Sequence, residues 1–434
     1  MMYRLSIFVL QFLILIIALT FIFTNPFIVS LDIGNLKYSF SSNLFAVIFI
    51  SFIFLLYLVF YLFFRSRLSL GKYFLKNKYN KIEKGYLHFV DAMIAVANKD
   101  NKTALKSHKK MDSYLKDDPS LSLLLKSEVL KIEKKFPELN DIYEDMIKSK
   151  KTETLGYRGL MEQNLRNQDY HHAFLYGEKL FSINPNIEKL YDTLIFIAAK
   201  TKNWNQIILL SDKAFSNKII SKNDLNENKS IGFYEIAKIK YDSDIKDSLK
   251  NILKAVDLKK NFSPYVKLHL EIVAALNDIR NLKKLIKKYW SSNPSSLLRS
   301  IVIKILNDND LTNIKFINEI IKNNVGEEES KKLLIYFAIK NSKWDIARDN
   351  IIGMIGSNPS KDICYFMSEI ELRENNDKQK SDAWIMRAEN AKLENSWICR
   401  ITNQSQEEWS SLSNSGNYNS LVWSSPMMIR QNSN

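Results

Sequence analysis

The sequence predicts an all-α protein in which a two-helix transmembrane hairpin precedes a solenoid of short helical repeats. Three observations lead to this fold class. Two stretches near the N-terminus, residues 5–31 and 38–64, carry no charged side chain. Helix-length apolar segments then recur with a spacing of 34 residues. Glycine and proline are scarce, at 11 and 8 of 434 residues, which favours helices joined by short turns over a β sandwich.

The hairpin is expected over residues 1–67, with spans at about 5–24 and 44–64. The apolar centres, Leu5–Phe23 and Leu44–Phe64, hold 19 and 21 residues. At about 1.5 Å per residue each reaches roughly 30 Å, the thickness of the hydrocarbon core. Backbone groups in that layer must be paired within the segment, so both spans are expected to be helices. The first stretch is longer than a signal-peptide core, and no small-residue cleavage site follows it.

Flanking charges predict the orientation of the hairpin. Arg4 precedes the first span, and the connection 25–43 contains only Asp32 and Lys37 as charged residues. Seven basic residues follow the second span: Arg65, Arg67, Lys72, Lys76, Lys78, Lys81 and Lys84. This asymmetry puts both chain ends in the cytoplasm. Residues 68–85 are expected to form a basic juxtamembrane linker at anionic lipid headgroups, and the uncharged spans are interpreted as an anchor.

Helical repeats are expected over residues 86–395. Three pairs of positions share the 34-residue spacing: Tyr170 and Trp204, Ile245 and Ile279, Trp344 and Lys378. Asn-Pro pairs that end at Pro185, Pro294 and Pro359 lie 15 residues after three of these positions. A 34-residue helix–turn–helix period with a proline after the second helix is typical of tetratricopeptide repeats. The alternative is a non-repetitive helical bundle with accidental spacing.

Departures from the period are expected at three places. The spacing of 41 residues between Trp204 and Ile245 is interpreted as an inserted loop at Ser221–Ser230, and Leu311–Ile321 as a degenerate repeat. Residues 396–434 are expected to be a C-terminal cap and tail. Its tryptophans, Trp397, Trp409 and Trp423, are expected to cover the last exposed helix pair, because a terminal repeat has no neighbour. Gln431–Asn434 is expected to be disordered.

No pattern of catalytic residues is found. The sequence lacks a phosphate-binding glycine loop, a nucleophile elbow and a clustered metal-ligand motif, so no catalytic residues, no metal site and no enzyme are predicted. Two cysteines, Cys364 and Cys399, exclude a disulfide scaffold and a four-cysteine zinc site. The net charge of +15 is interpreted mainly as compositional. No nucleic-acid partner is predicted, because basic and aromatic residues are not interleaved.

The histidines and two charge runs were weighed as ligand contacts. His269 falls at a core position and is interpreted as a packed core residue rather than a haem ligand. His171 and His172 point about 100° apart on a helix. His88 and His108 flank the first helical pair, where a porphyrin contact is the less favoured reading. The runs Glu327–Glu329 and Lys283, Lys284, Lys287, Lys288 are interpreted as a solvated loop and a solvated basic helix face, the latter with anion binding as the alternative.

The chain resembles the HemY-type membrane proteins of proteobacteria, which have two N-terminal spans and then a tetratricopeptide region. The most specific stretch runs from Tyr143-Glu-Asp-Met146 through Glu153-Thr-Leu-Gly-Tyr-Arg-Gly-Leu160 to Asp169-Tyr-x-x-Ala173. A second similarity is Trp397-Ile-Cys399…Trp409…Trp423. Some members have paired cysteines there, whereas this chain has Thr402 and later serines, so no metal knuckle can be built.

The resemblance implies a protein of the bacterial cytoplasmic membrane that is associated with a late step of protoheme synthesis. It implies a scaffold for protein partners, among them late haem-pathway enzymes, with no cofactor of its own. Two alternatives stay open: a scaffold for envelope or membrane organisation, and direct binding of haem or porphyrin in the solenoid groove, for which no cofactor-binding residues are assigned. An unrelated flavin-dependent oxidase shares the family name, but its Gly-rich motif is absent here.

Overall fold

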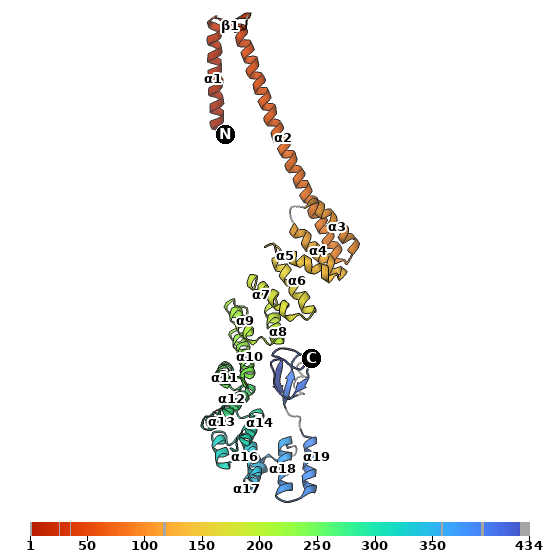
Figure 1. Cartoon of the computed structure of the whole chain (residues 1–434), viewed down its shortest axis with the longest axis vertical. Coiled ribbons are helices and arrows are strands. Elements are labelled where there is room, and N and C mark those ends of the chain that lie inside the picture. The colour runs from red at the N-terminus through yellow and green to blue at the C-terminus, as the bar shows by residue number, and fades with distance from the viewer. Residues whose placement is uncertain are drawn as a thin grey trace. The chain divides into compact units, whose positions relative to one another are not determined.

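The computed structural model describes residues 2–25, 27–34, 36–115, 119–356, 359–391 and 395–425. The chain divides into two compact units, Met1–Lys135 and Phe136–Asn434 (Figure 1). The boundary between the units, at Lys135, falls inside residues 86–395, which were expected to form one repeat region. The expected disorder of Gln431–Asn434 concerns residues outside the described ranges.

The first unit begins with a helix, a β-hairpin and a very long helix. These are α1 (Met2–Thr24), β1 (Ile28–Ile33), β2 (Leu36–Ser41) and α2 (Ser42–Ala97). The connection between the two predicted spans is therefore an antiparallel ladder, which the all-α expectation did not include. Gly34 begins the turn with a φ of +62°, and Asp32 pairs with Lys37 across the strands at 3.9 Å. A glycine accepts this left-handed backbone without strain, so it suits a tight hairpin.

Within the described part of the chain, the segment Ser42–Arg65 is long and apolar enough to cross a membrane. Its side chains from Val47 to Arg65 are exposed, whereas Ser42 and Ala46 at its start are buried. The backbone of α1 is helical across the first predicted span and lies beside the first part of α2 (Figure 1). Many α1 side chains lie outside the described set, so its passage through a membrane stays a prediction.

The expected linker at residues 68–85 is helical. α2 continues without a break through these residues to Ala97, because the segment has no proline and is rich in residues that favour helices, such as leucine, lysine and glutamate. Two further helices, α3 (Asn101–Tyr114) and α4 (Pro119–Glu133), pack on the end of α2. Ala92, Met111 and Leu125 are fully buried where these three helices meet.

The second unit is a tetratricopeptide-like solenoid of helix pairs. Its first part contains α5 (Phe136–Met146), α6 (Glu153–Arg166), α7 (Tyr170–Ile183), α8 (Leu190–Lys200), α9 (Trp204–Ser216), α10 (Lys222–Lys240) and α11 (Ile245–Leu258). Its second part contains α12 (Ser263–Ala275), α13 (Ile279–Ser292), α14 (Ser296–Asp308), α15 (Ile314–Ile321), α16 (Glu328–Lys340), α17 (Trp344–Ile351), a 3₁₀ turn (Ile352–Met354), α18 (Lys361–Arg373) and α19 (Lys378–Glu389).

The 34-residue period is confirmed by where the helices begin. The six predicted positions, Tyr170, Trp204, Ile245, Ile279, Trp344 and Lys378, are the first residues of α7, α9, α11, α13, α17 and α19. Aspartate caps four of these helices, with the side chains of Asp169, Asp244, Asp278 and Asp377 accepting hydrogen bonds from backbone N–H groups. Such caps satisfy donors that a helix start leaves unpaired, which explains why the period is readable in the sequence.

The expected loop at Ser221–Ser230 is wrong. These residues form the cap and first half of α10, which is 19 residues long. Ser221 and Asp224 cap the helix reciprocally, each side chain accepting a hydrogen bond from the backbone N–H of the other. This arrangement fixes a helix start even in a polar stretch. The extra residues of this repeat therefore lengthen a helix.

The C-terminal part of the chain forms a small antiparallel sheet, β4-β3-β5. Its strands are β3 (Ser396–Cys399), β4 (Ser405–Gln406) and β5 (Leu421–Ser424), and Trp397 stands opposite Trp423. The prediction that its tryptophans cover the last helix pair is wrong, because they pack in one cluster with residues of α10, α11 and α12. We name residues 395–425 the C-terminal module.

Candidate functional site

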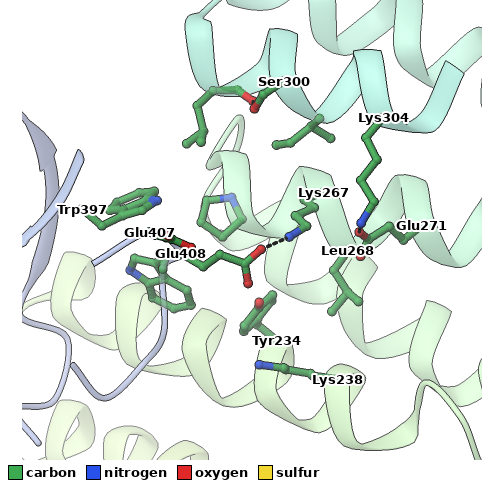
Figure 2. Close-up of a pocket in the computed structure, with 14 residues that line it drawn as sticks. Tyr234, Lys238, Lys267, Leu268, Glu271, Ser300, Lys304, Trp397, Glu407 and Glu408 are labelled. Carbon is green, nitrogen blue, oxygen red and sulfur yellow. Dashed lines mark hydrogen bonds and ion pairs between the residues drawn. The ribbon is translucent and has the colours of Figure 1, made fainter. Parts of the chain in front are cut away.

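A cleft with a volume of about 380 Å³ opens where the C-terminal module meets alternate helices of the solenoid (Figure 2). α10, α12 and α14 form one wall, and Trp397 with the loop Glu407–Trp409 forms the other. The floor is apolar, with Pro264, Leu268 and Ile301 among its residues. Because α10, α12 and α14 are the first helices of successive repeats, the cleft runs across the repeats on one face of the solenoid.

Aromatic packing fixes the module beside the cleft. Trp409 is 7% exposed and lies edge-on to Tyr234 and Phe262, with ring centroids 5.3 and 5.2 Å apart. Tyr265 completes the cluster at 5.0 Å from Tyr234. Trp397 packs on Phe262 at 6.0 Å. Large rings buried in this way contribute both apolar area and edge-to-face attraction, so the wall of the cleft is rigidly placed.

A chain of polar contacts joins the module to earlier helices. The Tyr418 hydroxyl donates to Asn228 Oδ1 at 3.0 Å, and Asn228 Nδ2 donates to the Tyr191 hydroxyl at 3.0 Å. The Tyr191 hydroxyl lies 3.0 Å from Ser211 Oγ. Burial raises the pKa of both Tyr418 and Tyr191, so the two phenols stay protonated and act as hydrogen-bonding groups. The module is thereby held against α8, α9 and α10.

Charged side chains line the open side of the cleft. Glu408 pairs with Lys267 at 2.6 Å (Figure 2), and this hydrogen bond lowers the pKa of the Glu408 carboxyl. Lys304 lies 4.0 Å from Glu271, whose pKa is raised by burial. Lys238 forms no ion pair within 4.0 Å among the described residues. The cleft lining therefore carries three lysines, one each from α10, α12 and α14, together with the carboxylates of Glu271, Glu407 and Glu408.

This arrangement is suited to binding a peptide segment. The loop Glu407–Trp409 of the module shows which side chains the helix wall can bind. The Glu408 carboxylate pairs with a lysine, and the Trp409 ring packs in an aromatic cluster. The Lys238 ammonium beside an apolar floor can hold an acidic side chain of an extended segment whose apolar side chains lie on that floor. Sequence periodicity did not find these residues. The acidic pair Glu407-Glu408 directly before Trp409 was the available signal.

Comparison with known proteins identifies the N-terminal part of the chain. Residues 28–131 match the family model described as "HemY protein N-terminus". The chain carries a HemY-type N-terminal region. The match spans β1, β2, α2, α3 and most of α4, and it confirms the resemblance found in the sequence. No curated protein matches the chain.

Solved structures give weaker likenesses. The TPR2AB domain of yeast Sti1 in a pHSP90 complex covers 70% of this chain and 98% of its own, with 9% identity and a TM-score of 0.29. A tetratricopeptide repeat protein from Parabacteroides merdae covers 57% and 92%, with 12% identity and a TM-score of 0.28. PilF of Pseudomonas aeruginosa covers 50% and 96%, with 12% identity and a TM-score of 0.26. At such scores the fold assignment depends on the helix pairs of this chain itself.

The histidines of the HemY-type region are engaged where α2, α3 and α4 pack together. His88 lies 3.6 Å from Asp91 and stacks on Tyr114. His108 lies 3.2 Å from Ser122 Oγ and 3.5 Å from Asp112. Each imidazole thus has a polar neighbour within its local helix packing.

In the solenoid, His269 is a core residue, as interpreted from the sequence. It is 4% exposed, and its Nδ1 lies 2.7 Å from the Tyr289 hydroxyl. Burial, aided by the charge of Lys288, lowers the pKa of His269 to about 4, so the ring is neutral at pH 7. His172 hydrogen-bonds to Asp169. Although His171 and His172 are adjacent on the helix, their rings lie edge-on to each other, with the ring centroids 5.5 Å apart.

The two charge runs take part in packing. Lys283 and Lys287 lie over the ring of Phe316, and Lys287 also pairs with Glu319 at 2.7 Å. The expectation of a loop at Glu327–Glu329 is wrong, because α16 begins at Glu328, although Glu327 and Glu328 are exposed as expected. Glu329 accepts a hydrogen bond from Arg299 at 2.8 Å. A buried cation on the neighbouring helix explains why an acidic run begins α16.

The motif glycines that carried the resemblance serve helix packing. The ring of Tyr143 on α5 lies where a Cβ at Gly159 would be only 2.3 Å away. Gly156 likewise approaches the Tyr143 carbonyl, with 2.8 Å to a built Cβ. Glycines here let α5 and α6 approach closely. This stretch therefore builds the start of the solenoid.

Cys399 is the last residue of β3 and is surrounded by polar groups of the C-terminal module. Burial would raise its pKa, but hydrogen bonding with Ser420, Thr402 and backbone N–H groups lowers the pKa to about 5. Ser415 Oγ and Asn417 Nδ2 lie 3.6 and 3.8 Å from Sγ. Among the described residues, no three histidine, cysteine or acidic side chains gather in a way that could hold a metal ion.

Proposed function

We propose that this chain is a membrane-anchored scaffold that holds a protein partner in the cleft between the C-terminal module and α10, α12 and α14. The observation that carries the proposal is the cleft itself: it combines an apolar floor with the ion pairs of Lys267 and Lys304, and with Lys238, which forms no ion pair among the described residues. The N-terminal apolar segment supports a membrane anchor. The absence of a recognisable catalytic pattern in the sequence supports a scaffold over an enzyme.

The site of action that we propose is a late step of protoheme synthesis at the bacterial cytoplasmic membrane. The HemY-type N-terminal region supports this assignment. The basic residues that follow Ser42–Arg65 support a cytoplasmic location for the solenoid. Helix α1, which carries no charged residue after Arg4, would serve as the other span of the anchor. Porphyrins are apolar and reactive, so a scaffold that keeps successive enzymes together would limit their loss.

The test combines a deletion strain with capture from native membranes. Loss of the protein is expected to cause porphyrin accumulation, and capture of the crosslinked full-length chain is expected to recover late haem-pathway enzymes. Normal porphyrin levels together with recovery of envelope-assembly proteins would contradict the haem assignment and favour a role in membrane organisation.

A titration with haem separates the scaffold from a direct haem-binding protein. The structure gives one reason to expect no binding at the buried histidine: His269 Nδ1 is already engaged by Tyr289. The full-length chain in detergent should therefore leave the Soret band of micromolar haem unshifted. A shift that one histidine or tyrosine substitution abolishes would overturn the scaffold reading.

A further inference from the structure

We propose that α2 continues beyond the membrane segment as a pairing surface for a second copy of this chain, with the two helices parallel and in register. The surface consists of Leu75, Tyr79, Ile82 and Tyr86, which we name the α2 seam. Their exposed fractions are 70%, 69%, 37% and 50%. Four large apolar side chains left open in a row on one helix indicate a missing neighbour.

The spacing of the seam is that of a two-helix contact. Successive members lie four, three and four residues apart, which places them on one face of the helix. The same alternation keeps the apolar positions of two parallel helices opposite each other in a coiled coil. The chain itself covers a different side of α2: α3 and α4 pack on Ala92 and Ala95. The seam is thus available in the folded protein.

Charges beside the seam favour a second copy as the occupant. Lys78 comes directly before Tyr79, and Glu83 comes directly after Ile82. In a parallel, in-register pair of helices, the residue before an apolar seam position of one copy lies next to the residue five positions further along the other copy. Lys78 of each copy then meets Glu83 of the other, twice by symmetry. Among the described residues, neither side chain has an ion-pair partner within 4.0 Å.

The membrane segment supplies the direction and the register. Ser42–Arg65 belongs to the same unbroken helix as the seam. Two copies anchored by this segment enter the bilayer in the same direction and at the same depth, so their seams face each other without a shift along the axis. Leu75 lies 10 residues beyond Arg65, roughly 15 Å along the helix, and Tyr86 lies about 16 Å further. The seam therefore extends away from the lipid.

Cysteine crosslinking of the full chain in native membranes tests the contact. Ile82→Cys is in the seam, whereas Lys84→Cys lies on the opposite face of the same turn and is the matched control. The natural cysteines, Cys364 and Cys399, are buried, and the unsubstituted chain serves as the blank. Mild oxidation should give at least five-fold more disulfide-linked dimer with Ile82→Cys than with Lys84→Cys. Equal yields, or a crosslink only to a different protein, would overturn the proposal.

A charge exchange in the Ile82→Cys background tests the register. Lys78→Glu and Glu83→Lys should each lower the dimer yield several-fold, because each places like charges side by side. The double variant should restore the yield, since it recreates both pairs with the charges exchanged. If the seam instead contacted lipid or an unrelated acidic helix, the double variant would not restore the yield. Failure of the double variant to recover would overturn the parallel, in-register pairing.

Discussion

Replacement of Trp409 by alanine is expected to lower the free energy of unfolding by about 3–5 kcal/mol, the range for removing a large buried aromatic side chain. Trp409 is 7% exposed and contacts Tyr234, Phe262 and Tyr265 at once. The loss would fall on the contact between the C-terminal module and α10–α12. Urea denaturation of the full-length chain in detergent gives the change, and limited proteolysis should show earlier cleavage within residues 395–425.

Trp423→Ala is the matched control in the same sheet. Trp423 is half-buried at the edge of the module and packs on Trp397 at 5.3 Å without reaching α10 in the aromatic cluster. Its removal should cost less than half as much as that of Trp409. If both substitutions cost the same, Trp409 does not anchor the module as described.

Arg299→Ala is expected to cost about 3–5 kcal/mol, because it removes one partner from a buried ion network. Arg299 on α14 is 8% exposed and contacts Glu329 on α16 and Asp362 on α18. Lys332, also buried, lies 3.6 Å from each of these carboxylates. Without the guanidinium, the buried Lys332 ammonium would face both carboxylates alone, and these side chains are only 20% and 27% exposed. Equilibrium denaturation of the variant measures the loss.

An exposed ion pair provides the comparison for Arg299. Arg158 pairs with Glu162 one turn along α6 at 2.9 Å, and both side chains are about half exposed. Water and salt screen such a pair, so Arg158→Ala should change stability by less than about 1 kcal/mol. If Arg299→Ala and Arg158→Ala lower the free energy of unfolding by similar amounts, burial of the α14–α16–α18 network does not add to stability.

The repeat architecture was predictable because its signals are local. Aspartate caps, apolar residues at helical spacing and Asn-Pro pairs recur within each 34-residue unit, and Tyr170, Trp204 and Trp344 each begin a helix. The start of α10 was missed because its polar residues resemble a loop, although Ser221 and Asp224 cap a helix. The hairpin β1–β2 also had a local signal, a Gly-Asn pair between alternating residues, which the long uncharged stretches concealed.

The cleft was not predictable from periodicity because distant segments build it. Lys267 meets Glu408 across 141 residues, and Tyr418 meets Asn228 across 190. The sequence singled out Trp397, Trp409 and Trp423 correctly as packing residues but could not say which repeats they cover. A terminal lid was the simplest expectation for a solenoid. The tryptophans pack instead with α10, α11 and α12, in the middle of the array.

Site-specific photo-crosslinking in native membranes tests the central claim, that the cleft holds a protein partner. A photoreactive phenylalanine derivative at Ser300, an exposed cleft residue on α14, is compared with one at Lys284, an exposed residue on α13 that does not line the cleft. A discrete heterologous adduct from Ser300 and none from Lys284 is the expected result, with late haem-pathway enzymes in the adduct. The same adducts from both positions, or none from Ser300, would contradict the claim.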